Sequence, residues 1–204
     1  MRLMDVEFAL TQEPLPGGVA ALLADARDRC GALEPDFLVS IPAFVPSDFE
    51  QVYRALAWLR DSHLTTGQRF LEWGSGIGAV ACLAAQVGFH AVGIEIEPAL
   101  VEIAESLAAD QQIDVQFACG SYVPRGAEPF VDTAGELTWL RTDRPDCYAD
   151  LDLDPEDFDV IFAYPWPGEE QVIFDLFADC AAVGALLLTY HGQDGVRLQR
   201  NVKR

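Results

Sequence analysis

The chain has 204 residues, half of them hydrophobic, which predicts one folded domain with a sizeable core rather than a disordered segment. Its formal net charge is −20 and Lys203 is its single lysine, so a nucleic-acid partner is disfavoured, because phosphate contacts need Lys and Arg. No apolar run reaches the roughly 20 residues of a membrane span. Five scattered cysteines without a CxxC pair indicate neither a disulfide framework nor a zinc site. We therefore expect a protein of the reducing cytoplasm, without membrane or metal.

The first third of the chain is predicted to be mainly helical. Apolar residues at helical spacing predict one helix over residues 19–30 and a second over residues 48–62. Ser47 followed by Glu50 fits a capping box at the start of the second helix. We therefore assign residues 1–66 to an N-terminal helical or lid segment ahead of the sheet.

The clearest pattern in the chain lies in residues 69–98, RFLEWGSGIGAVACLAAQVGFHAVGIEIEP. Apolar runs at 70–73 and 91–96 predict two strands, and the almost wholly apolar segment 77–87 predicts a buried helix between them. Two strands joined by a crossover helix lie parallel in practice. The glycine turn before the helix lets a ligand approach backbone N–H groups at a helix N-terminus. The stretch therefore predicts a nucleotide-type binding site.

Further strands and helices follow this unit. Apolar runs and helical spacing predict strands at 115–118, 159–164 and 185–190 and helices at 98–110 and 169–182. The turn signal Asp194-Gly195 predicts that residues 196–202 return as an antiparallel strand.

Residues 119–157 lack a clear period and contain several prolines and a dense run of acids. So long a loop within a domain is usually functional, so we interpret it as a substrate-side insertion, with a short strand or helical turn around 137–140. Residues 67–204 then form a ligand-binding unit that contains this insertion. Together with residues 1–66 they form one structural domain.

Four motifs resemble those of class I S-adenosylmethionine-dependent methyltransferases. Residues Glu72 to Gly78 resemble the acid-x-G-x-G-x-G loop of that family, and Gly93 to Leu100 resemble its second strand with the terminal acid. Residues Phe158 to Pro167 resemble the fourth strand and the motif after it. Residues Phe44 to Ser47 resemble a segment that some members place over the cofactor. The resemblance spans about residues 41–191.

The resemblance implies a Rossmann-like, doubly wound α/β fold with helices on both faces of a mostly parallel sheet. The implied strand order is 3-2-1-4-5, where strand 1 precedes the glycine turn. Because only 13 residues follow His191, we expect an abbreviated antiparallel C-terminal edge. The N-terminal helices would be an extension of this fold.

The resemblance also implies that residues 67–204 bind S-adenosyl-L-methionine as the cofactor. Glu72 would serve its amino group, and Glu95 would accept hydrogen bonds from both ribose hydroxyls. Ile96 would pack on the adenine. Many members place an acid or amide after the third strand for the adenine amino group, where this chain offers the Ser121 hydroxyl and the Tyr122 ring. The other cofactor-binding residues lie in the glycine turn: Gly74, Ser75, Gly76 and Gly78.

The motif after the fourth strand bears on the reaction. Methyltransferases that act on amino nitrogens often carry N/D-P-P-Y/F there, and the best overlay puts Ala163 at the polar position. The catalytic candidates are Tyr164, Pro165 and Trp166, at the carboxyl end of the strand, where an aromatic ring can face the sulfonium through a cation–π contact. His191, at the end of the fifth strand, is a candidate general base.

These features predict methyl transfer to an amine-bearing or cationic acceptor, either a small molecule or a protein side chain, because acidic and aromatic groups favour positive charge. The acidity has a simpler interpretation as a solubility bias. The missing polar group at Ala163 leaves a catalytically silent cofactor-binding or scaffolding protein open. Residues 74–79 also satisfy G-x-G-x-x-A, as in NAD-dependent oxidoreductases, although Glu72 counts against that reading. The sequence does not set the oligomeric state.

Overall fold

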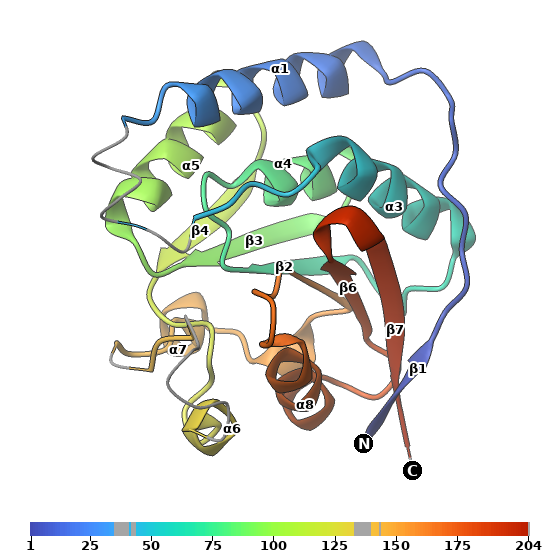
Figure 1. The fold of residues 1–204 in the computed structure, drawn as a ribbon, viewed down its shortest axis with the longest axis vertical. Helices are drawn as coiled ribbons and strands as arrows, with labels where there is room; N and C mark the ends of the chain where they lie inside the picture. The colour runs from blue at the N-terminus through green and yellow to red at the C-terminus, as the bar shows by residue number, and fades with distance from the viewer. Residues whose placement is uncertain (35–40, 42–43, 133–139, 143, 204) are drawn as a thin grey trace.

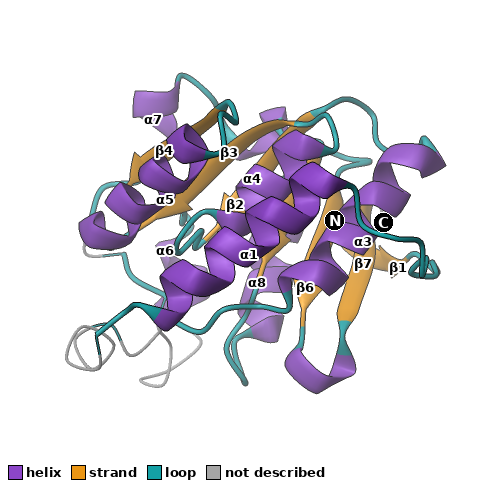
Figure 2. Ribbon diagram, turned by 90° about the horizontal axis from the view of Figure 1, so that it is seen from above, coloured by secondary structure: helices purple, strands orange, loops and turns teal. Residues whose placement is uncertain are grey.

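The structure, a computed structural model, describes residues 1–34, 41, 44–132, 140–142 and 144–203. In this part of the chain seven strands form one sheet with helices on both faces (Figures 1 and 2). The strands are β1 (Arg2–Asp5), β2 (Arg69–Trp73), β3 (His90–Glu95), β4 (Val115–Cys119), β5 (Val160–Ala163), β6 (Leu186–Tyr190) and β7 (Val196–Val202). The helices are α1 (Gly17–Gly31), α3 (Phe49–Ser62), α4 (Ala79–Gln86), α5 (Pro98–Asp110), α6 (Glu128–Asp132), α7 (Tyr148–Leu151) and α8 (Glu170–Cys180). Two 3₁₀ turns, Pro155–Asp157 and Gly192–Asp194, complete the described elements.

The sheet has the order β1-β7-β6-β5-β2-β3-β4. Its five parallel strands, β4, β3, β2, β5 and β6, confirm the predicted order 3-2-1-4-5. The edge beyond β6 differs from the prediction. Strand β7 pairs antiparallel with β6 from Leu186↔Arg200 to Tyr190↔Val196, so this edge is not abbreviated. Strand β1 then pairs antiparallel with β7 and brings the N-terminus beside the C-terminus, where only helices were expected (Figure 1).

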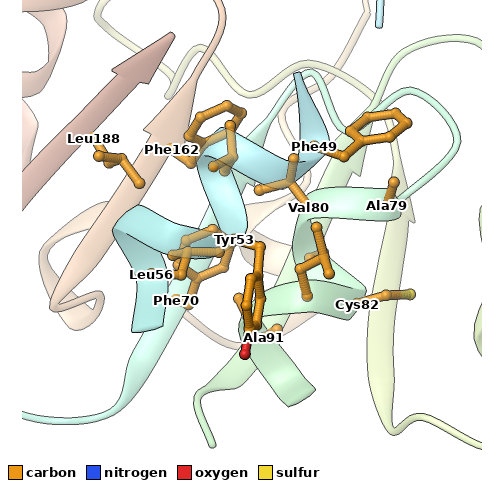
Figure 3. Packing of buried hydrophobic residues seen from close by; sticks show 14 of the residues in the cluster. Phe49, Tyr53, Leu56, Phe70, Ala79, Val80, Cys82, Ala91, Phe162 and Leu188 are labelled. Carbon is orange, nitrogen blue, oxygen red and sulfur yellow. The ribbon is translucent and has the colours of Figure 1, made fainter. Parts of the chain in front are cut away.

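Helices α1, α3, α4 and α5 cover one face of the sheet (Figures 1 and 2). Helix α4 packs on β2 and β3, and α1 and α3 pack against α4. Residues 79–84 are therefore at most 2% exposed, which confirms the buried helix predicted after the glycine turn. Figure 3 shows Phe70 and Phe162 of the sheet packing with Leu56 of α3 and Val80 of α4.

Helices α6, α7 and α8 cover the opposite face (Figure 1). Neighbouring residues of one strand point to opposite faces, so Phe70 belongs to the first core and Leu71 to the second. Strands β5 and β6 are buried throughout, as expected for parallel strands covered on both sides. The strand or turn predicted around 137–140 lies, except for Leu140, outside the described residues.

The insertion over residues 119–157 contributes α6 and α7 to this layer. None of the helices in the described part of the chain combines the length and the hydropathy that a bilayer span requires.

Helix α3 begins one residue later than the predicted capping box requires. Asp48 is the N-cap, and its Oδ1 accepts hydrogen bonds from the backbone N–H groups of Glu50 and Gln51, both at 3.1 Å. Its Oδ2 accepts another from the Gln51 side chain at 2.9 Å. The prediction that Ser47 caps this helix was therefore wrong. Both residues are good caps, and the position of the first helical residue, Phe49, decides between them.

We predict that Asp48→Ala lowers the free energy of unfolding by about 1 kcal/mol, because two N–H groups at the start of α3 lose their acceptor. Urea unfolding of the purified protein measures this change. Ser47→Ala is the matched control and should leave the midpoint nearly unchanged. A larger loss for Ser47→Ala than for Asp48→Ala would show that the cap is assigned to the wrong residue.

Candidate functional site

A cavity of about 440 Å³ opens at the carboxyl edge of the parallel strands. It lies next to the boundary between β2 and β5, where the strand order reverses, which is where ligands bind in open α/β sheets. Its walls are the segments that follow four neighbouring strands and the segment before α3: residues 72–77, 95–97, 120–122, 164–167 and 44–47. The site residues predicted from sequence therefore come together around the cavity, apart from Gly78, which does not line it.

The glycine turn between β2 and α4 forms the floor of the cavity. Gly74, Gly76 and Gly78 have φ angles of 70°, 52° and 74°, in the region that favours glycine. A Cβ on Gly78 would lie 2.5 Å from the Phe117 ring, and one on Gly76 would lie 2.8 Å from the Phe44 ring. The turn thus needs glycine for its backbone angles and for space. It also brings the segment before α3 against the cavity floor.

Glu95 ends β3 and is tied to the glycine turn. Its Oε2 accepts the Gly76 N–H at 2.7 Å, and its Oε1 accepts the N–H groups of Ile96 at 2.7 Å and Glu97 at 3.0 Å. Burial raises the pKa of Glu95, while these three hydrogen bonds lower it. A carboxylate oxygen can accept two hydrogen bonds, so Oε2 keeps capacity for a ligand hydroxyl.

Glu72 lies near the end of β2 and is 4% exposed. Its Oε2 accepts the backbone N–H of Ala81 in the first turn of α4 at 2.8 Å. Burial holds the pKa of Glu72 well above its usual range, the Ala81 hydrogen bond lowers it, and the charge of Glu95 raises it. A positive group in the cavity would relieve this burial cost, because opposite charges favour the ionised form.

Ser75 contributes a polar atom that no described residue binds. The residue is 5% exposed and lines the cavity, and its Oγ has no hydrogen-bond partner among the described residues. Its backbone is fixed, because the Ser75 N–H donates to the Ile94 carbonyl at 2.9 Å. Buried polar groups are normally satisfied, so an orphaned hydroxyl in a cavity wall points to a ligand.

The wall after β4 is built by stacked aromatic rings. Tyr122 stacks on Trp73 with ring centroids 5.3 Å apart and an interplanar angle of 11°. The Trp73 Nε1–H donates to the Tyr148 hydroxyl at 3.0 Å, which in turn donates to the Tyr122 carbonyl at 2.8 Å. The insertion, through Tyr148 of α7, therefore fixes two cavity residues in place.

Ser121 lies in the same wall, but its hydroxyl is already engaged. It donates to the Arg141 carbonyl at 2.7 Å and accepts the Val123 N–H at 3.1 Å. Arg141 also lines the cavity, where its Nη1 lies 3.3 Å from Glu97 Oε1. Neither partner of this ion pair was selected from the sequence, because the two are far apart in the chain. Glu97 lies within the motif Gly93 to Leu100 but is not its terminal strand acid, and Arg141 belongs to no motif.

The motif after β5 forms the remaining wall. Tyr164, Pro165 and Trp166 line the cavity, and the Tyr164 ring packs edge-on against Tyr190 with centroids 4.9 Å apart. Ala163 does not line the cavity. It is 2% exposed and packs in the core on the α8 side of the sheet. The overlay that gave Ala163 the polar position therefore names a residue whose side chain could not reach a ligand in this cavity.

His191 is separated from the cavity. It lines a different hollow, beside β1 and β7, and its Nε2 lies 2.7 Å from the Thr189 hydroxyl. Burial, and then the charge of Arg197, lower the pKa of His191. The structure gives no support to its role as a general base at the main cavity. Glu169, which follows the Pro-Trp-Pro-Gly loop and which the sequence also places at the carboxyl end of the strands, is a buried residue of the main cavity.

No protein-family model matches the chain, and no curated protein matches its sequence. Solved structures do resemble it. An RNA methyltransferase from Salinibacter ruber in complex with S-adenosyl-L-homocysteine is 19% identical, with a TM-score of 0.53 over 78% of this chain and 95% of its own. A methyltransferase from Geobacter sulfurreducens is 17% identical, with a TM-score of 0.51 over 94% of this chain and 93% of its own.

A third similar structure is an O-methyltransferase from Bacillus cereus in complex with S-adenosyl-L-homocysteine, 15% identical, with a TM-score of 0.51 over 87% of this chain and 67% of its own. At these identities the likeness establishes the fold. The chain has the Rossmann-like fold of class I S-adenosylmethionine-dependent methyltransferases, as the motifs indicated.

We predict that Glu72→Gln stabilises the protein without ligand at pH 8. The pKa of Glu72 is raised on folding from its ordinary value of 4.5, so above pH 4.5 the folded state binds more protons than the unfolded state, and stability falls as the pH rises. A neutral amide removes this loss. We expect a melting temperature about 2–4 °C higher at pH 8, which corresponds to ~1 kcal/mol in a domain of this size.

Thermal unfolding followed by circular dichroism at pH 5 and pH 8 measures this effect. The gain should shrink towards pH 5, where Glu72 is closer to neutral in both states. Glu102→Gln, an exposed change of the same charge on α5, is the control and should show no such gain. A melting temperature for Glu72→Gln below that of the wild type at pH 8 would show that the ionised carboxylate is stabilising.

Proposed function

We propose that this chain binds S-adenosyl-L-methionine and transfers its methyl group to an amine-bearing or cationic acceptor, either a small molecule or a protein side chain. The observation that carries the proposal is the pair of buried carboxylates, Glu72 and Glu95, that flank a glycine turn at the floor of the cavity. The cofactor supplies an electrophilic methyl group on a positively charged sulfur. Acidic walls favour a ligand of that charge.

The residues at the floor fit the methionine and ribose parts of such a cofactor. Oε2 of Glu95 can accept from a ribose hydroxyl in addition to the Gly76 N–H. Glu72 offsets a positive amino group, and the orphaned Oγ of Ser75 supplies one more polar contact. A Cβ on Gly74 would meet only the Tyr122 ring, at 3.9 Å, so the backbone there is open on the cavity side.

The adenine would lie along Ile96 and the wall after β4. Ile96 lines the cavity directly after Glu95, and Tyr122 offers a ring held in place by Trp73. The Ser121 hydroxyl is engaged with the insertion, so we propose that Ser121 shapes this wall rather than binding the adenine amino group by its side chain.

The charge of the cavity favours a positive acceptor. Its described lining carries four carboxylates, Glu72, Glu95, Glu97 and Glu169, against one guanidinium, that of Arg141. Tyr164 and Trp166 add aromatic faces, which attract cations. Catalysis would rest mainly on placing the acceptor in line with the methyl group at the distance of a near-attack conformer. A net charge of −20 disfavours an RNA acceptor.

The same walls weigh against a nicotinamide dinucleotide. Its pyrophosphate would have to lie at the glycine turn, where Glu72 and Glu95 are both close. Two carboxylates beside a diphosphate would repel it.

Calorimetric titration tests the cofactor assignment. We expect the wild type to bind S-adenosyl-L-methionine and S-adenosyl-L-homocysteine and not NAD. Glu95→Gln should weaken the binding of both S-adenosyl compounds by about ten-fold or more. The substitution replaces one carboxylate oxygen, which accepts charge-assisted hydrogen bonds, by an amide NH₂ group, which can only donate. Glu102→Gln is the matched control on exposed surface and should bind as the wild type does. Thermal unfolding of each variant establishes that it is folded.

Binding of NAD alone, or of none of the three, would reject the proposed cofactor. Incubation of the wild type with methyl-labelled cofactor and pooled amines or basic proteins then tests turnover. Labelled amine products support the proposed reaction. Cofactor binding without transfer to any pool would favour the silent, scaffolding alternative.

A further inference from the structure

We infer that Tyr148 is a positioning residue for the cofactor, which acts by holding the aromatic wall after β4 from outside the cavity. The inference rests on the proposed function and goes beyond it. It gives a role in cofactor affinity to a residue that belongs to no motif and does not line the cavity. It also gives the insertion, through α7, a role on the cofactor side of the site.

The chain just before α7 lies alongside the cavity wall like an added strand. The Ser121 N–H donates to the Pro145 carbonyl at 3.0 Å, and the Cys147 N–H donates to the Ser121 carbonyl at 3.2 Å. Ser121 and Asp146 form a parallel bridge in this way. The two segments are so close that a Cβ on Gly120 would lie 2.6 Å from the Cys147 sulfur. The later part of the insertion therefore supports the wall from its outer side.

Tyr148 extends this contact from the backbone to two aromatic residues. It is the first residue of α7 and is 3% exposed. Its hydroxyl donates to the Tyr122 carbonyl at 2.8 Å and accepts the Trp73 Nε1–H at 3.0 Å, so one oxygen serves both residues. Burial raises the pKa of Tyr148, so the hydroxyl stays protonated near neutral pH and keeps its role as a donor.

The two residues that Tyr148 joins meet at the cavity. Trp73 ends β2 and Tyr122 follows β4, with β3 between these strands. Their rings stack on each other, and both residues line the cavity. The Tyr122 ring also lies beside Gly74, whose added Cβ would be 3.9 Å from it. A ligand on the glycine turn therefore meets a wall whose orientation is set by the Tyr148 hydroxyl.

Loss of this hydroxyl would release the wall. The buried Trp73 N–H would lose its acceptor and the Tyr122 carbonyl would lose its donor, and buried polar groups are costly when they are left without a partner. The two rings would then be less firmly held before the ligand arrives. A ligand that must order side chains as it binds loses affinity, whereas a wall fixed in advance spares it that cost.

The test is calorimetric titration of Tyr148→Phe with S-adenosyl-L-homocysteine. The substitution keeps the ring and its packing and removes only the hydroxyl. We expect binding about ten-fold weaker than in the wild type, the effect of ordering one or two side chains on binding. Unchanged affinity would overturn the inference.

Asn201→Ala is the matched control for a general loss of stability. The Asn201 side chain is fully buried and donates to the Ala181 carbonyl at 2.8 Å, and it does not line the cavity. Like Tyr148→Phe, this variant loses a buried hydrogen bond and should melt at a lower temperature, but it should bind S-adenosyl-L-homocysteine as the wild type does. An equal loss of affinity in both variants would overturn the inference, because destabilisation alone would then account for it.

A double-mutant cycle shows whether Tyr148 acts through Tyr122. Tyr122→Ala removes the ring that Tyr148 holds in place. Adding Tyr148→Phe to Tyr122→Ala should therefore weaken binding by less than about two-fold, although each variant lowers the melting temperature. A full ten-fold loss in both backgrounds would show that Tyr148 acts by another route and would overturn the inference.

The readouts separate this inference from the proposed function. Failure of the wild type to bind S-adenosyl-L-homocysteine rejects the proposed cofactor, and the inference falls with it. Binding by the wild type and by Tyr148→Phe with equal affinity rejects only the role of Tyr148. A lower melting temperature of Tyr148→Phe at that equal affinity would show that the hydroxyl stabilises the fold and does not position the cofactor wall.

Discussion

The hydrogen bond from the Gly76 N–H to Oε2 of Glu95 is the interaction on which the site depends, because it joins the glycine turn after β2 to the end of β3. It requires parallel pairing of these strands in the register Glu72↔Gly93 and Trp73↔Ile94, which places the turn beside Glu95. It also requires the left-handed backbone angles of the turn. A side chain on Gly93 would collide with Ser75 and Phe117, so the neighbouring strand must be bare at that point as well.

The same arrangement explains why the first layer of helices is so deeply buried. Helix α4 must start directly at the turn, so that its first N–H groups face the carboxylate of Glu72. A helix so close to the sheet has little surface left once α1 and α3 pack on it, which is why its residues are almost all small or apolar. The burial that makes Glu72 costly in the folded protein is therefore a consequence of the packing that positions it. Site and core are built by the same contacts.

Much of this could be predicted from the sequence. The glycine turn and the five parallel strands follow from local patterns, because each is determined by an apolar run or by glycines within a few neighbouring residues. The antiparallel edge of the sheet, formed by β7 and β1, could not be predicted in the same way. Strand β1 has four residues, too few for a periodic signal, and it is held by its partner β7, nearly 200 residues later, through pairs such as Asp5↔Gln199. The prediction of the residue that caps α3 was wrong because Ser47 and Asp48 are adjacent and both are good N-caps, so the local sequence does not distinguish them.

The catalytic candidates Tyr164, Pro165 and Trp166 line the cavity and their roles stay predictions, whereas the overlay on Ala163 is informative in another way. A motif overlay assumes that the polar group stays on the strand, and it therefore judged the site by Ala163. In the structure the direction of a strand side chain is fixed by its register with Trp73 and Thr189, so residue 163 faces the core whatever its type. Glu169, the N-cap residue of α8, does line the cavity, and the turn closed on Trp166 fixes its position. The alanine at position 163 thus says little about what the cavity can bind. Binding depends on which side chains line the cavity, and the carboxylate of Glu169 is among them.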